Sequence, residues 1–294
     1  MPIKAKQIQT WNVEPLQYKQ NKYPTSAADL PKFYWVGLFV GARQSGKTYT
    51  LCKLLKHYEE AGVFDSDGKP MSQRIIIFSP TVDANPCFST LKNLDPSDIH
   101  NTYSDEALRE VVDDIKAEKE ATEKYKEDLQ LWRKYCQVKD IDALSDWEIM
   151  QISSWNYEKP EPPRFPNGVV NFLILDDLVG TSALRQGRSA LTYLAIRNRH
   201  LQINLAILVQ GMRQIPKIIR TNANVFAIWK FANKKMILDD LYEEVSNCLK
   251  PEEFEELYEY CTQDQHDCMV LDFSKPREEI VRRSFKEIVN LCHI

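Results

Sequence analysis

The sequence predicts an α/β fold, with a mostly parallel central sheet flanked by helices and an inserted helical arm. Three observations predict it. Apolar segments of strand length alternate with amphipathic segments of helical period. Several of the strand-like segments are apolar throughout, as expected for strands that are covered on both faces. A long heptad-like stretch within residues 104–137 predicts a helix of roughly 50 Å.

We divide the 294 residues into three parts. Residues 1–32 are polar and interrupted by prolines, which predicts a loosely structured N-terminal arm. Residues 33–103 and 167–294 form the predicted core. Residues 104–166 form the predicted helical insertion, because strand-like segments resume directly after the proline-rich segment that closes it. This insertion is either an ordinary packing helix pair or an arm with a specific docking role.

The elements before residue 167 follow from local signals. An apolar strand leads into a Gly-containing loop, and an amphipathic helix then runs from about Lys47 to a point before Gly62. A second strand covers 73–80 and ends at a proline. After the long helix, Ser145 and Glu148 form a capping-box pattern that opens a shorter helix.

The elements after residue 167 alternate in the same way. We expect strands at 168–177, 203–210, 224–231 and 267–273, and helices around 189–199 and 251–261.

Charge is segregated along the chain, although the formal net charge is only -4. From Leu178 to Leu238 there is no Asp or Glu, and an acidic stretch follows directly. The basic residues of this window are Arg185, Arg188, Arg197, Arg199, Arg213, Lys217, Arg220, Lys230, Lys234 and Lys235. Such asymmetry predicts one face that meets a polyanion.

Membrane and metal-site signals are weak. The longest apolar runs have strand length, so we expect no membrane segment, and the first residues lack the apolar stretch of a secretory signal peptide. The seven cysteines include no C-x-x-C pair, which favours reduced thiols. Cys261, His266 and Cys268 are spaced too loosely for a zinc site, and we expect them to be ordinary packing residues.

A phosphate-binding loop is predicted at Gly41–Thr48, which reads GARQSGKT and lies between a strand and a helix. Its glycines let backbone N–H groups point at phosphates, and the helix N-terminus favours anions. We expect Lys47 to reach the β- and γ-phosphates of ATP and Thr48 to bind Mg²⁺. The predicted nucleotide-binding residues are Gly41, Ala42, Arg43, Gln44, Ser45, Gly46, Lys47, Thr48 and Tyr49.

Two acids end the strand at 168–177. Asp176 is the predicted second Mg²⁺ ligand, and Asp177 would polarise the attacking water, unless it merely caps a turn.

The strand at 73–80 lies in the sequence between the phosphate-binding loop and the strand that ends in the two acids. This order predicts a sheet in which another strand separates them, as in RecA-like motor ATPases. Gln210 ends the next strand, where an amide could contact both γ-phosphate and water, or simply begin a loop.

Taken together, these motifs resemble the genome-packaging ATPases of nucleocytoplasmic large DNA viruses and their virophages, within the FtsK–HerA superfamily. The matching positions are Arg43, Ser45, Gly46, Lys47, Asp176, Asp177, Arg199, His200, Gln210, Pro216, Arg220 and Asn222. Many superfamily members have Glu where Asp177 stands, which leaves the base assignment open. The 104–166 insertion is long, so the resemblance implies no function for it.

The resemblance implies an ATP-driven motor that moves double-stranded DNA into a preformed capsid. It implies a homo-oligomeric ring, a pentamer or hexamer, that works with a capsid or portal component in the virion or at a viral factory in the host cytoplasm. In such a ring, Arg199 or Arg220 would enter the neighbouring nucleotide site. Basic residues of the window, namely Arg185, Arg188, Arg213 and Lys217, would contact the DNA backbone without reading base sequence.

Two alternatives stay open. One is another DNA translocase or helicase of the same superfamily, and the other is a nucleotide-binding scaffold without motor activity.

Overall fold

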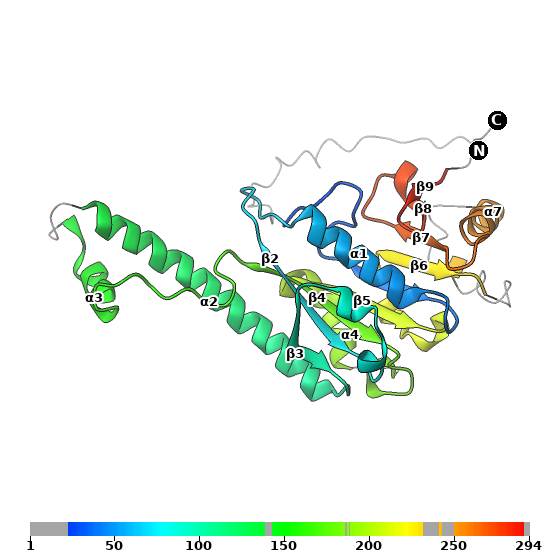
Figure 1. Ribbon diagram of the computed structural model, residues 1–294, viewed down its shortest axis with the longest axis horizontal. Coiled ribbons are helices and arrows are strands. Elements are labelled where there is room, and N and C mark those ends of the chain that lie inside the picture. The colour runs from blue at the N-terminus through cyan, green and yellow to red at the C-terminus, as the bar shows by residue number, and fades with distance from the viewer. Residues whose placement is uncertain are drawn as a thin grey trace, which may run out of the picture.

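The computed structural model describes residues 23–138, 143–185, 187, 189–231, 241–242 and 250–290. These residues form a nine-stranded sheet in the order β3-β2-β4-β5-β1-β6-β7-β8-β9, with helices on both faces (Figure 1). The strands are β1 (Val36–Val40), β2 (Ser72–Phe78), β3 (Leu94–His100), β4 (Val169–Asp176), β5 (Ile203–Val209), β6 (Val225–Trp229), β7 (Cys268–Asp272), β8 (Val281–Arg283) and β9 (Glu287–Ile288). Neighbours from β3 to β6 are parallel, and β6 to β9 are antiparallel. The predicted fold class is confirmed.

The helices cover the sheet in two layers. They are α1 (Lys47–Ala61), α2 (Asp105–Gln137), α3 (Asp146–Ser154), α4 (Ala190–Leu201), α5 (Lys217–Arg220) and α7 (Pro251–Cys261). Alternate residues of β4 point to opposite faces. Phe172 and Ile174 belong to one buried cluster with α1, whereas Leu173 and Leu175 belong to a second cluster with α2 and α4. None of the helices among the described residues is long and apolar enough to cross a membrane.

The strand order brings three chain segments to one edge. β5 lies between β1 and β4, so the expectation of an interposed strand is confirmed. Because these three strands are parallel, the loop after β1, the acids at the end of β4 and Gln210 after β5 share the carboxyl edge of the sheet. Ligands of open α/β sheets bind at this edge.

Strands β3, β8 and β9 were not predicted. The sequence of β3 is LDPSDIH, which contains a proline and two acids and shows no apolar pattern. β8 and β9 are only three and two residues long. Of the predicted N-terminal arm, residues 1–22 lie outside the described residues, and the side chain of Leu30 is buried.

Helix α2 begins in the core and leaves it. The Ser104 side chain accepts a hydrogen bond from the Ala107 N–H and caps the helix, which then runs for 33 residues. Leu108, Val111 and Ile115 are buried against the sheet. The helix then extends beyond the sheet to α3 (Figure 1), and the capping box predicted for α3 is present.

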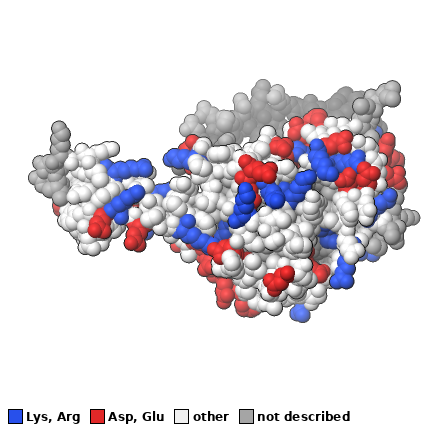
Figure 2. All heavy atoms as spheres, in the orientation of Figure 1, with Lys and Arg blue, Asp and Glu red and all other residues white. Residues whose placement is uncertain are grey.

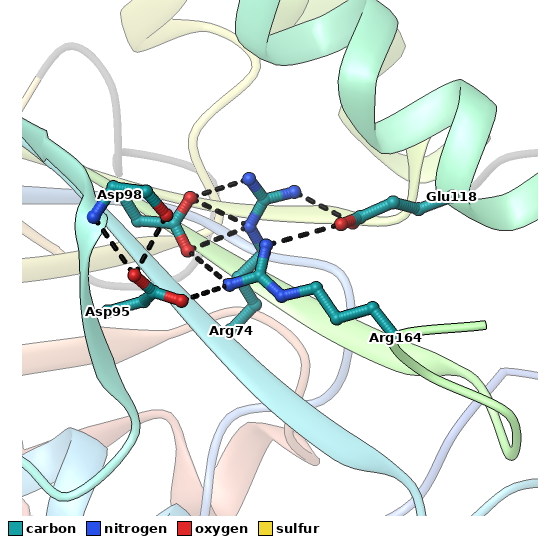
Figure 3. Close-up of polar contacts among 6 residues, drawn as sticks. Arg74, Asp95, Asp98, Glu118 and Arg164 are labelled. Atoms are coloured by element: carbon teal, nitrogen blue, oxygen red, sulfur yellow. Dashed lines mark hydrogen bonds and ion pairs between the residues drawn. The ribbon is translucent and has the colours of Figure 1, made fainter. Parts of the chain in front are cut away.

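Five charged residues join where α2 leaves the sheet (Figure 3). We call Arg74, Asp95, Asp98, Glu118 and Arg164 the arm clamp. The Arg74 guanidinium donates to both carboxylate oxygens of Asp98 at 3.0 Å and to Glu118 at 2.7 Å. Arg164 donates to Asp95 at 2.7 Å and to Glu118 at 3.3 Å. The clamp thus ties β2 and β3 to α2 and to the segment that returns from α3.

Candidate active site

The loop after β1 has the conformation that its glycines permit. Gly46 has a φ of 101°, in the left-handed region that favours glycine. A Cβ on Gly41 would lie 2.6 Å from Ser45 Oγ and 3.0 Å from Trp229 Cβ, so no side chain fits there. The Gly41 N–H donates to the Val209 carbonyl at 3.1 Å and holds the start of the loop against β5.

Lys47 lies at the mouth of this loop. Its Nζ donates to the carbonyl oxygens of Gly41 at 2.7 Å and Ala42 at 2.8 Å. Burial lowers the pKa of Lys47, and the nearby carboxylates of Asp176 and Asp177 oppose that shift. A cation held in this way, at a helix N-terminus, is placed to bind the phosphates of a nucleotide.

Thr48 and Asp176 meet as the sequence predicted for a Mg²⁺ site. The Thr48 hydroxyl donates to Asp176 Oδ2 at 3.2 Å. Asp176 is only 6% exposed, and burial raises its pKa, opposed by the Thr48 hydrogen bond and by Lys47. A hydroxyl and a carboxylate suit Mg²⁺, which binds few protein ligands and keeps several waters. The donor set therefore fits this cation.

Asp177 and Gln210 face each other across neighbouring strands. Gln210 Nε2 lies 3.5 Å from Asp177 Oδ1, at the long limit of a hydrogen bond. Asp177 has a φ of 53°, a left-handed conformation that is uncommon outside glycine. The backbone N–H of Gln210 donates to the Gln214 side chain at 3.2 Å. A carboxylate and an amide arranged in this way could orient one water molecule between them.

Seven of the predicted residues line a single cleft of about 560 Å³, a volume suited to a small-molecule ligand. Arg43, Gln44, Lys47, Thr48, Asp176, Asp177 and Gln210 all border it. The segment after β2 forms another wall with Thr81, Asn85 and Pro86, which were not predicted. The sequence did carry a signal for these residues, because they follow a strand that ends at the same edge of the sheet.

The position of His266 beside the phosphate loop was also not predicted. Its Nδ1 lies 3.3 Å from the Ser45 carbonyl, and its own carbonyl accepts from Trp229 Nε1 at 3.0 Å. We expected an ordinary packing residue, whereas this histidine supports the outer side of the phosphate loop. No local pattern could have shown this, because His266 and Ser45 are 221 residues apart in the chain.

The candidate trans arginines lie away from this cleft. Arg199 is exposed near the end of α4, which leads into the start of β5 at the opposite edge of the sheet. Arg220 closes α5, on the connection that runs from the end of β5 to the start of β6. Neither borders the cleft.

Of the predicted DNA-contacting residues, Arg185 follows a short 3₁₀ turn, Arg213 lies in another, and Lys217 opens α5. Arg185, Arg213 and Lys217 are exposed, and Arg188 lies outside the described residues. On the face that carries α1, acidic and basic side chains are interspersed (Figure 2), so the described residues of this face form no patch of one sign. The exposed Arg197 and Arg199 belong to α4, which covers the other face of the sheet.

Neither a protein-family model nor a curated protein matches this chain. Among solved structures, the genome-packaging NTPase B204 of Sulfolobus turreted icosahedral virus 2, in complex with ATP-gammaS, is similar at 13% identity and a TM-score of 0.44, over 87% of this chain and 98% of that one. The cytoplasmic domain of the type VII secretion ATPase EccC of Thermomonospora curvata is similar at 16% identity and a TM-score of 0.42, over 89% of this chain and 25% of that one. These are distant likenesses, and they carry no inference about function.

Proposed function

We propose that this chain is an ATP-hydrolysing motor that moves double-stranded DNA into a preformed capsid. One observation carries the ATPase part of this proposal. The Thr48–Asp176 hydrogen bond joins the phosphate loop to the acidic strand, beside Lys47 and beside the Asp177–Gln210 pair. Binding, metal and water-orienting groups thus converge on one cleft. The motor part is supported by the ordered motifs that resemble packaging ATPases.

Each side chain has a role that follows from its position. Lys47 and the loop N–H groups bind the β- and γ-phosphates. Thr48 and Asp176 would hold Mg²⁺, which would neutralise charge on the phosphate oxygens. Asp177 accepts the proton of the attacking water, and the Gln210 amide orients that water toward the γ-phosphorus.

A ring supplies the remaining group. In a head-to-tail ring, each nucleotide site faces the surface of the next subunit. Arg199 and Arg220 do not border their own cleft, and we assign one of them to the cleft of a neighbour. Arg185, Arg188, Arg213 and Lys217 would then contact the phosphates of the DNA.

The first experiment measures ATP hydrolysis with and without double-stranded DNA. Lys47→Ala should lower the rate by about 10²–10³-fold, because it removes a group that stabilises charge on the transferred phosphate. Lys116→Ala, an exposed position on α2, is the matched control and should keep the rate. DNA stimulation should fall steeply as salt rises. A wild-type rate that DNA does not change would contradict the motor, and the absence of any hydrolysis would favour a nucleotide-binding scaffold.

A mixing experiment tests the trans arginine. Asp177→Asn and Arg220→Ala subunits are each expected to be inactive alone. Mixed rings should recover part of the activity, because some interfaces combine an intact Asp177 with an intact arginine from the neighbour. The same mixture with Arg199→Ala identifies which arginine acts. Verified mixed rings without recovery would remove that arginine from the role.

A further inference from the structure

A second hollow continues from the phosphate cleft. This groove of about 400 Å³ lies between the outer face of α1 and the segment after β2, and it shares Pro86 with the cleft. Tyr49, Cys52, Pro86 and Cys87 supply its apolar walls, and Lys53 and Lys56 border it from α1. Tyr49 directly follows Thr48 and is 63% exposed. The Tyr49 ring therefore lies beside the phosphate site, on the face of α1 that also carries Lys53 and Lys56.

The direction of the bound nucleotide follows from the cleft. The groups that act on the γ-phosphate, Asp177 and Gln210, lie at the ends of β4 and β5. The α-phosphate must therefore lie toward the start of α1, near Thr48 and Tyr49. The nucleoside continues from there, either into the groove or toward the opposite side of the loop.

On its opposite side the loop contacts His266. His266 Nδ1 lies 3.3 Å from the Ser45 carbonyl, and a Cβ built on Gly46 would lie 3.5 Å from His266 Cβ. The Trp229 indole fixes this histidine through its carbonyl. Arg283 donates to Asp267 at 2.8 Å and braces the same segment. Among the described residues, the groove on the α1 side is the hollow that continues from the cleft.

We propose that this groove binds the nucleoside of ATP, with the base stacked on the Tyr49 ring and enclosed by Pro86 and Cys87. The inference rests on the proposed function, since it assumes that the triphosphate occupies the cleft. It assigns recognition of the nucleoside to residues outside the phosphate motif. The segment after β2 then contacts both ends of the nucleotide, through Thr81 and Asn85 in the cleft and Cys87 in the groove.

Binding of ATPγS and of inorganic tripolyphosphate, each with Mg²⁺, separates the two parts of the site. Tyr49→Ala should weaken ATPγS binding by about 10-fold, the effect of losing one base–aromatic stack, and leave tripolyphosphate binding unchanged. Tyr49→Phe should retain the affinity for ATPγS. The matched control is Tyr193→Ala, because Tyr193 is also an exposed tyrosine but lies on α4.

Three results would overturn the proposal. If Tyr49→Ala changes neither affinity, the groove does not hold the base, although the ATPase proposal stands. If it weakens both ligands equally, Tyr49 serves the phosphate loop. A wild-type protein that binds neither ligand would overturn the proposed function together with the groove.

Cys87 gives a second readout that needs no variant. ATPγS should protect it from N-ethylmaleimide, whereas tripolyphosphate should not, as followed by peptide mass spectrometry. Cys136, an exposed thiol on α2, should react under every condition and serves as the internal control. Burial raises the pKa of the Cys52 thiol to about 12, so Cys52 should react slowly throughout. Equal labelling of Cys87 with and without ATPγS would contradict the proposal.

Discussion

Two groups of charged residues lie beside the two ends of β2, and they differ in how their charges are paired. At the carboxyl end of β2, the cleft holds Lys47, Asp176 and Asp177. The hydrogen bonds of the two aspartates are 3.2 and 3.5 Å long, Asp177 has a left-handed backbone conformation, and the pKa of Asp176 is raised. At the amino end of β2, Arg74 and Asp98 are 5% and 2% exposed and joined by several short hydrogen bonds. The charged side chains of the cleft are only partly paired with opposite charges, whereas those of the arm clamp are fully paired. The two groups should therefore respond in opposite ways to neutralisation.

The largest effect on stability is expected at the arm clamp. Asp98→Ala leaves the buried Arg74 guanidinium without its main partner, which should lower the free energy of unfolding by about 3–5 kcal/mol. Urea denaturation measures this change. Asp113→Ala breaks an exposed pair with Lys116 on α2 and should cost less than about 1 kcal/mol.

The same variant also tests the separation of the two sites. Its ATPase rate per folded molecule should match that of the wild type below the unfolding transition, because the clamp lies at the other end of β2. A loss of stability no larger than that of the Asp113 control would show that Arg74 finds another partner.

The cleft was predictable from the sequence because its information is local. Gly41–Thr48 are consecutive, and Asp176 and Gln210 end apolar strands whose parallel arrangement follows from the alternation of elements. The ends of α1 were predicted by the same local signals, and the cap of α3 by its capping box. Local chemistry therefore determined both the elements and most of the cleft.

The clamp was not predictable because its members come from four segments that only the tertiary fold brings together. Asp98 lies in β3, a strand that shows no apolar alternation, and its charge is buried because Arg74 of β2 and Arg164 neutralise it. A hydrophobic pattern interprets such a segment as a loop. His266 was missed for the same reason, since its role depends on a contact with the distant Ser45.

In the cleft, we expect a smaller change in the free energy of unfolding, and of opposite sign. Burial raises the pKa of Asp176 above its value in the unfolded chain. The ionised carboxylate therefore destabilises the fold, and this cost grows as the pH rises through the unfolded pKa toward the folded pKa. Without nucleotide at pH 7, Asp176→Asn should raise the free energy of unfolding by about 1 kcal/mol and abolish ATP hydrolysis.

The pH dependence separates this electrostatic cause from a packing change. Near pH 3, where the carboxyl is protonated in both states, the difference between Asp176→Asn and wild type should vanish. Asp67→Asn, in an exposed turn, is the control and should change stability little at either pH. A variant that is less stable than the wild type at pH 7 would show that Asp176 is a structural ion and not a strained ligand.

The smallest change in the free energy of unfolding is expected at Arg164, an exposed member of the arm clamp. Arg164 is 40% exposed and contacts Asp95, which is 46% exposed, so Arg164→Ala should cost less than about 1 kcal/mol. Its segment keeps two other links, from Thr122 to the Phe165 carbonyl and from Lys126 to the Asn167 carbonyl. Amide hydrogen exchange should therefore rise only around residues 160–165. If Arg164→Ala instead costs as much as Asp98→Ala, the five residues act as one cooperative unit, and partial exposure does not weaken its members.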